Sequence, residues 1–225
     1  MTGMFVIVAL MAAASADTFA YAYPAQARGI PALKARLDAE AARLRAQFRR
    51  DAAADARTLQ AADVPHLPWE LSKRWEVVTS TSAFLSLSAM TRSFSGGAHG
   101  GVSFDALLWD RRERRAIVPL TIFTGRAAFN AALRQTFCAA LDRAREERRG
   151  KPVGSGSGFN DCIDPTAQTI ILGSSDRRRF DQIGVLMGPY AAGSYAEGPY
   201  EVTLRVTPAV MAAVKPAYRS AFAVR

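Results

Sequence analysis

The chain has 225 residues, which suits one large domain or two small domains sharing an interface and is enough to bury a core. Hydrophobic residues make up 49% and charged residues 22% of the chain, which excludes wholesale disorder. The 29 Lys and Arg residues outnumber the 20 Asp and Glu residues and give a net charge of +9, which favours anionic partners such as acidic glycans, membrane surfaces or nucleic acid.

An uncharged apolar run from Met4 to Ala14 leads into Ala14-Ser15-Ala16. Small residues at positions 14 and 16 form the A-x-A-like site that signal peptidase requires, and the run is short for a membrane span. We therefore predict a signal peptide over residues 1–16, a mature chain that starts at Asp17, and a periplasmic or secreted location. The run lacks the preceding Lys or Arg that signal peptides usually carry. A buried N-terminal strand is the alternative. We expect no transmembrane segment beyond the signal.

The chain has two cysteines, Cys138 and Cys162. An even number of cysteines in an exported chain favours a disulfide, so we predict a Cys138–Cys162 bridge. A zinc site needs four ligands, and His66 and His99 are the only histidines. We expect no metal and no other cofactor.

Two amphipathic helices are predicted by apolar residues that recur at spacings of three and four. The first begins at Ile30-Pro31 and carries the stripe Leu33, Leu37, Ala41, Leu44 and Phe48. The second runs from about residue 126 to 148 and carries the stripe Phe129, Leu133, Phe137, Ala140, Leu141 and Ala144. Arg49, Arg50 and Arg57 are expected on the solvated side of the first helix. The second is expected to fray after Glu146 into a Gly/Ser-rich loop.

The remaining elements are strands, several of them with period-two alternation. Their predicted ranges are 20–24, 75–81, 83–90, 102–108, 116–120, 168–172, 180–187 and 200–206, with a helical turn over 208–214. We therefore predict an α+β fold: a mostly antiparallel sheet packed against two amphipathic helices, in two small subdomains that share an interface.

The glycine-rich stretch Ser95-Gly-Gly-Ala-His-Gly-Gly101 joins two alternating strands. A phosphate-binding loop or a nucleophile elbow would precede a helix, whereas a strand follows here. We predict a hairpin turn in which Gly96 and Gly97 hold backbone conformations that a β-carbon would strain, and no catalytic residue. A small hydrolase that uses Ser95, His99 and an acid such as Asp105 is the alternative.

The segment from Gly188 to Tyr200 places Tyr190, Tyr195 and Tyr200 among small residues and prolines. Tyrosines offer a large contact area and a polar tip at little cost in rotamer entropy, which suits a recognition loop. We predict that these tyrosines and His99 contact a ligand. The alternative is that the tyrosines cap the end of the sheet.

Several features resemble the paired extracytoplasmic domains of the anti-sigma factor RsiV and the deacetylase PdaC. They are Tyr21-Ala-Tyr-Pro24, Phe84-Leu-Ser-Leu87, the turn at Ser95 to His99 and the loop from Gly188 to Gly198. The resemblance implies a PdaC-like N-terminal subdomain over residues 17–94 and an RsiV C-terminal-like subdomain over residues 95–225. Such domains are mostly of unknown function, and in RsiV the region binds lysozyme.

The sequence carries no recognisable anti-sigma or deacetylase segment beside these features, so we predict a non-catalytic recognition domain and not an enzyme. A chain of charge +9 is repelled by a basic lysozyme and attracted by an anionic surface. We therefore favour an anionic envelope glycan such as peptidoglycan as the partner, with a lysozyme-binding or lysozyme-inhibiting role as the alternative. Nucleic acid is not expected, because the arginines are scattered and form no recognised motif.

Overall fold

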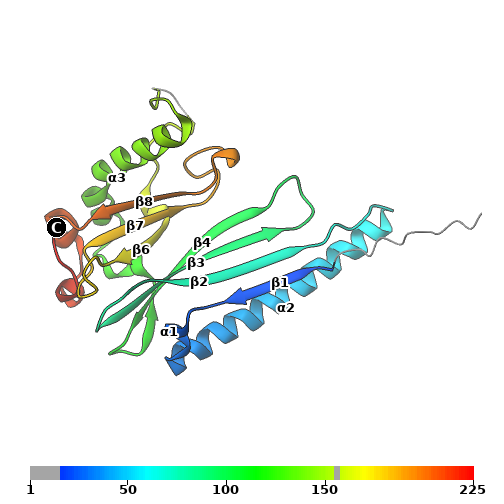
Figure 1. Cartoon of the computed structure of the whole chain (residues 1–225), viewed down its shortest axis with the longest axis horizontal. Coiled ribbons are helices and arrows are strands. Elements are labelled where there is room, and N and C mark those ends of the chain that lie inside the picture. Colours follow the sequence, from blue (N-terminus) through cyan, green and yellow to red (C-terminus); the bar gives the residue numbers. More distant parts are fainter. Residues whose placement is uncertain (1–15, 155–157) are drawn as a thin grey trace, which may run out of the picture.

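The computed structural model describes residues 16–154 and 158–225 (Figure 1). The predicted signal peptide, apart from Ala16, lies outside these residues. The fold is α+β and its sheets are mostly antiparallel, which confirms the predicted fold class. Within the described part of the chain, no helix combines the length and apolar character needed to cross a bilayer.

A five-stranded sheet with the order β1-β2-β3-β4-β5 occupies the first half of the chain. Its strands are β1 (Thr18–Ala22), β2 (Glu70–Ser80), β3 (Phe84–Phe94), β4 (Gly101–Asp110) and β5 (Arg115–Ile117). β1 pairs in parallel with β2, and the other pairs are antiparallel. Two helices, α1 (Ala25–Arg28) and α2 (Pro31–Ala61), accompany this sheet, and α2 runs along it (Figure 1).

The alternation of side chains along the strands determines which residues of the sheet face α2. The predicted stripe of α2 turns inward at Leu33 and Leu37, which are fully buried. They pack against side chains from alternate positions of three strands: Trp75, Leu85, Leu87, Ala89, Leu107 and Trp109. Successive side chains in a strand point to opposite faces, so the intervening residues of β2, β3 and β4 face away from α2.

A second, three-stranded sheet has the order β6-β7-β8, with both pairs antiparallel. It consists of β6 (Thr169–Gly173), β7 (Gln182–Met187) and β8 (Tyr200–Arg205), and α3 (Arg126–Arg149) and α4 (Pro208–Ala213) accompany it. Short 3₁₀ helices are η1 (Pro119–Ile122), η2 (Pro165–Ala167), η3 (Tyr195–Glu197) and η4 (Pro216–Ala221). The α3 stripe Phe129, Leu133, Phe137 and Leu141 is fully buried, as predicted.

The two halves share one core at the ends of β3 and β4. Phe84 and Leu108 lie on the face of the first sheet that turns away from α2, and both belong to the buried cluster of the second half. Toward the hairpin between β3 and β4, the same face no longer contacts the second half of the chain, and its residues are partly or fully exposed. The predicted subdomain boundary at residues 94 and 95 lies at the hairpin between β3 and β4, and both of these strands belong to the first sheet.

A disulfide ties the middle of α3 to the following loop, and a glycine terminates the helix. The predicted disulfide is present between Cys138 and Cys162, with their Cα atoms 5.4 Å apart. The expected fraying after Glu146 is wrong: the helix continues to Arg149 and is terminated by Gly150, which has a φ of +66°. A left-handed glycine is a frequent helix terminator, because only glycine adopts that conformation without steric cost.

Candidate functional site

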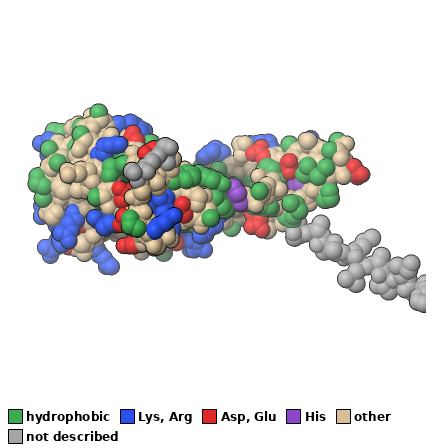
Figure 2. All heavy atoms as spheres, turned by 90° about the horizontal axis from the view of Figure 1, so that it is seen from above, with side chains coloured by type: hydrophobic (Ala, Val, Ile, Leu, Met, Phe, Trp, Pro, Cys, Tyr) green, Lys and Arg blue, Asp and Glu red, His purple; other side chains and the backbone are tan. Residues whose placement is uncertain are grey.

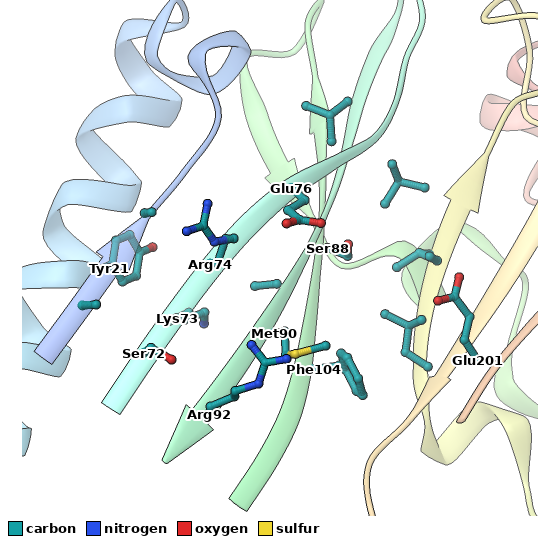
Figure 3. Close-up of a pocket in the computed structure, with 17 residues that line it drawn as sticks. Tyr21, Ser72, Lys73, Arg74, Glu76, Ser88, Met90, Arg92, Phe104 and Glu201 are labelled. Carbon is teal, nitrogen blue, oxygen red and sulfur yellow. The ribbon is translucent and has the colours of Figure 1, made fainter. Parts of the chain in front are cut away.

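A groove of about 600 Å³ lies where the first sheet emerges from contact with the second (Figure 3). We call it the sheet-face groove. Its floor is the exposed face of β2 and β3 with part of β4, and side chains of β6, β7 and β8 form its opposite wall. The residues used below are Ser72, Arg74, Glu76, Met90, Arg92 and Phe104 on the floor and Glu201 on the wall.

The strand register places these floor residues in rows. Arg74 is opposite Met90, which is opposite Phe104, and Ser72 is opposite Arg92 in the next row. Residues opposite each other in a sheet project from the same face, with Cβ atoms about 5 Å apart. The register therefore brings Arg74 and Arg92 to one exposed surface with Met90 and Phe104 beside them.

Arg74 and Arg92 are the available cations of the groove. Both are exposed, and neither forms an ion pair or a side-chain hydrogen bond with any other described residue. Two carboxylates, Glu76 and Glu201, face the same space, Glu76 from the floor near Ser88 and Glu201 from the wall (Figure 3). The groove thus offers guanidinium donors for anions, carboxylate acceptors for hydroxyl or amide groups, and a small apolar platform.

A cluster of three aromatic side chains lies at the hairpin end of this face. The ring of His99 stacks on Tyr195 with centroids 3.9 Å apart, and its Nε2 atom is 3.0 Å from the Tyr190 hydroxyl. The Nδ1 atom of His99 is 3.1 Å from the carbonyl oxygen of Gly100. A carbonyl only accepts, so Nδ1 donates to it; in the neutral ring the Tyr190 hydroxyl then donates to Nε2.

This aromatic cluster adjoins the groove. Tyr195 lines a second depression with Ser72, Arg92 and Val102, and Ser72 and Arg92 also line the sheet-face groove. Tyr190 is 54% exposed and has a φ of +67°, a conformation that costs a non-glycine residue energy and that the surrounding structure must enforce. The cluster and the groove therefore form one continuous surface across the sheet.

Arginines at the end of α3 hold the loop that carries these tyrosines. Arg145 Nε donates to the carbonyl of Ala192 (2.9 Å), and Arg148 donates to the carbonyls of Glu197 (2.6 Å) and Pro199 (2.7 Å). Arg149 Nε lies 2.8 Å from the Glu197 carboxylate. The charge run at the end of α3 resembles a solvated surface in the sequence, yet it fixes the shape of the loop.

Glu197 is the acceptor at the centre of this loop. Burial alone raises the pKa of Glu197, but hydrogen bonds from Tyr200, Arg149 and Ser194 outweigh it and lower the pKa to about 2. Gly193 packs so closely that a β-carbon there would lie 2.6 Å from a Glu197 carboxylate oxygen. The carboxylate is therefore charged at neutral pH and joins the loop to both α3 and β8.

The predicted site residues divide into two groups. His99, Tyr190 and Tyr195 come together on the surface, as described above. Tyr200 does not join them, because it is 1% exposed and donates its hydroxyl hydrogen to Glu197 while Arg148 lies over its ring. The position of Tyr200 agrees with the alternative reading, a tyrosine that packs at the end of the sheet.

The glycine-rich stretch forms the predicted hairpin turn between β3 and β4, and the two turn glycines differ. Gly96 has a φ of +80°, which favours glycine. Gly97 has no positive φ, and a β-carbon there would meet nothing within 4 Å. The expectation of strain at Gly97 is therefore wrong.

The alternative hydrolase arrangement does not assemble among the described residues. His99 is bonded to Gly100 and Tyr190, as described above. Asp105 faces the α2 side and pairs with the buried Lys73 at 2.7 Å, and Lys73 also contacts Glu40 at 2.5 Å. Within residues 16–154 and 158–225, no three His, Cys, Asp or Glu side chains are grouped so that they could hold a metal ion.

Comparisons with known proteins show what the N-terminal part is similar to. Residues 14–101 match the family model described as "Deacetylase PdaC", so this part of the chain is similar to PdaC, as the sequence features indicated. The match covers β1, β2, β3, α1 and α2, and therefore much of the sheet-face groove. No curated protein matches the chain.

Two solved structures resemble the larger part of the chain. A DUF3298 family member from Bacteroides fragilis aligns with a TM-score of 0.52 and 18% identity, over 76% of this chain and 66% of that one. A DUF3298 family protein from Pseudomonas aeruginosa aligns with a TM-score of 0.50 and 17% identity, over 76% of this chain and 72% of that one. At these identities the two likenesses show the fold alone.

Proposed function

We propose that this chain is an extracytoplasmic, non-catalytic recognition domain that binds an anionic cell-wall glycan of the peptidoglycan type in the sheet-face groove. The observation that carries the proposal is the pair Arg74 and Arg92, both exposed and without an acidic partner among the described residues, beside Met90 and Phe104. Arginine is suited to carboxylates, because its fork of donors matches both oxygens.

The mixed character of the groove supports peptidoglycan over a simple polyanion. Peptidoglycan combines carboxylates with hydroxyl and amide groups on the same strand. Arg74 and Arg92 would bind the carboxylates, and Glu76 and Glu201 would accept hydrogen bonds from hydroxyl or amide groups. The aromatic ring of Tyr195 offers an apolar face with a polar tip, which suits contact with a sugar ring.

Location and charge support the same proposal. The predicted signal peptide and the disulfide are both typical of proteins that leave the cytoplasm. Lys and Arg side chains form several separate patches on the face seen in Figure 2, most of them on the wider lobe. The net charge of +9 attracts an anionic wall over long range, whereas the groove provides the specific contacts.

Co-sedimentation of the mature chain with purified peptidoglycan across a salt series tests this proposal. We expect retention at low salt that falls as salt rises, because screening weakens exposed charge contacts. The double variant Arg74→Gln/Arg92→Gln should lower the apparent affinity about fivefold to thirtyfold, from two contacts of about 0.5–1 kcal/mol each. The matched control Arg178→Gln/Arg179→Gln removes the same charge from an exposed turn and should bind like the wild type.

A titration with a basic lysozyme in the same buffers tests the alternative role. The proposal predicts weak or no lysozyme binding. Tight lysozyme binding without retention by the wall at low salt would contradict the proposal and support the lysozyme-binding role.

A further inference from the structure

Helix α2 carries a seven-residue repeat on its exposed side. Its arginines recur at Arg36, Arg43, Arg50 and Arg57, and each of the first three is followed three residues later by an alanine: Ala39, Ala46 and Ala53. All seven residues are exposed. We call the four arginines the arginine stripe.

Helix geometry converts this spacing into a regular line of charge. Seven residues advance an α-helix by about 10.5 Å, so the stripe extends over about 31 Å. A seven-residue repeat drifts by only about 20° per repeat around a straight helix, so the four arginines remain on one flank. Alanines beside them leave a shallow surface between successive charges.

The arginines of the stripe have no acidic partner among the described residues. Arg36 and Arg43 form no side-chain hydrogen bond with another described residue, Arg50 donates to Gln47, and Arg57 donates to the carbonyl of Ala53. Two acidic groups, Glu40 and Asp105, share a depression with Arg36 and Arg43, and both are already paired with Lys73. The flank thus presents four cations that the rest of the structure does not neutralise.

We propose that the arginine stripe is a second binding surface, separate from the sheet-face groove, for a linear acidic polysaccharide that lies along α2. A long polymer with a carboxylate on each sugar can reach successive arginines, whereas a short fragment reaches one or two. Exposed Arg–carboxylate contacts are individually weak, so binding depends on several contacts in a row. The stripe lies on the helix side of the sheet, and the groove lies on the other side, so the proposal does not rest on the function proposed for the groove.

The test uses the mature chain and polygalacturonate, a linear polysaccharide with one carboxylate per sugar, as a trimer and as a dodecamer. Wild type should bind the dodecamer at least about tenfold more tightly than the trimer at low salt, because only the longer chain spans several arginines. Arg43→Gln/Arg50→Gln should remove most of this gain and reduce the salt dependence of dodecamer binding.

A matched control lies on the same helix. Arg45→Gln/Arg49→Gln removes two charges from the other flank, where Arg45 lies 5.1 Å from the ring of Phe19, and should keep the length-dependent gain. An equal loss of dodecamer affinity in both double variants would show that only net charge matters and would overturn the proposal. So would equal affinity of wild type for the trimer and the dodecamer.

Two further comparisons complete the test. The first comparison uses a helical peptide with Glu at every seventh position. If this peptide binds more tightly than the dodecamer, the stripe binds a protein partner and the polysaccharide proposal is refuted. The groove variant Arg74→Gln/Arg92→Gln should retain the length-dependent gain. Loss of that gain in the groove variant alone would place polysaccharide binding in the groove and overturn the stripe.

Discussion

Replacement of Arg145 by Met should destabilise the protein more than any other exchange of an arginine on α3. The Arg145 side chain is 0% exposed, and its guanidinium donates to the carbonyls of Ala192 (2.9 Å), Asn160 (3.2 Å) and Asp161 (2.9 Å). It also lies 3.0 Å from the carboxylate of Asp142, which is 42% exposed. One side chain thus joins α3 to the disulfide-bonded loop and to the tyrosine loop.

The size of the expected loss of stability follows from the polar groups that Arg145→Met leaves without a partner. Three carbonyls lose their donor, and each unsatisfied buried group costs about 1–3 kcal/mol, less where water can enter. Loss of the ion pair adds little, because the remaining Asp142 carboxylate is 42% exposed and can be solvated. We therefore expect Arg145→Met to lower the free energy of unfolding by about 3–5 kcal/mol, and Arg145→Lys by less, since Lys keeps the charge but not the fork of donors.

Urea unfolding at neutral pH measures this effect. Arg143→Met is the matched control, because Arg143 is exposed on the same helix and should change the free energy of unfolding by less than about 0.5 kcal/mol. The slope with denaturant should stay constant, so that the shift in midpoint reports stability. A loss below about 1 kcal/mol for Arg145→Met would show that the network around Arg145 does not hold the two loops.

Three other predictions concern the same half of the chain and the hairpin. The denatured, unreduced protein should contain no free thiol, and two titratable thiols would refute the bridge. Cys138→Ser/Cys162→Ser should lower the free energy of unfolding by about 3 kcal/mol, because the bridge closes a loop with a sequence separation of 24. The pKa of Glu197 is about 2 in the folded protein against 4.5 for the free group. The Glu197 carboxylate should therefore contribute at most about 3 kcal/mol to the free energy of unfolding. This contribution should be fully present above pH 4.5 and should disappear as the pH falls toward 2. Glu197→Gln should flatten urea stability over that pH range, and an unchanged pH profile would contradict the assignment. Gly96→Ala should cost about 1 kcal/mol because of its positive φ, whereas Gly97→Ala should be nearly neutral; the reverse order in urea melts would be inconsistent with the turn geometry.

Local patterns in the sequence predicted the elements well, because their causes are local. The two long helices were predicted from the apolar spacing of Leu33 and Leu37 and from the apolar stripe of α3. Alternation fixed most strands and the hairpin at the glycine-rich stretch. Tyr200 could also have been assigned correctly: it alternates with Val202 and Leu204 in β8, and all three are buried.

The groove could not be predicted, because it depends on pairing between distant segments. Arg74 and Arg92 meet only through the register of β2 against β3, and Glu201 reaches them only because the second sheet packs beside the first. Neither relation leaves a periodic signal in the sequence. The burial of Lys73 and Arg145 has a similar origin, because contacts with segments far away in the chain cover both side chains.

Recognition of the cell wall by the sheet-face groove is tested by the retention of the mature chain by purified peptidoglycan at low salt, compared among the wild type, Arg74→Gln/Arg92→Gln and Arg178→Gln/Arg179→Gln. We expect strong retention of the wild type and of the turn variant, and a loss of about fivefold to thirtyfold in affinity for the groove variant. Equal retention of all three proteins, or no retention of the wild type, would contradict recognition of the cell wall by the sheet-face groove.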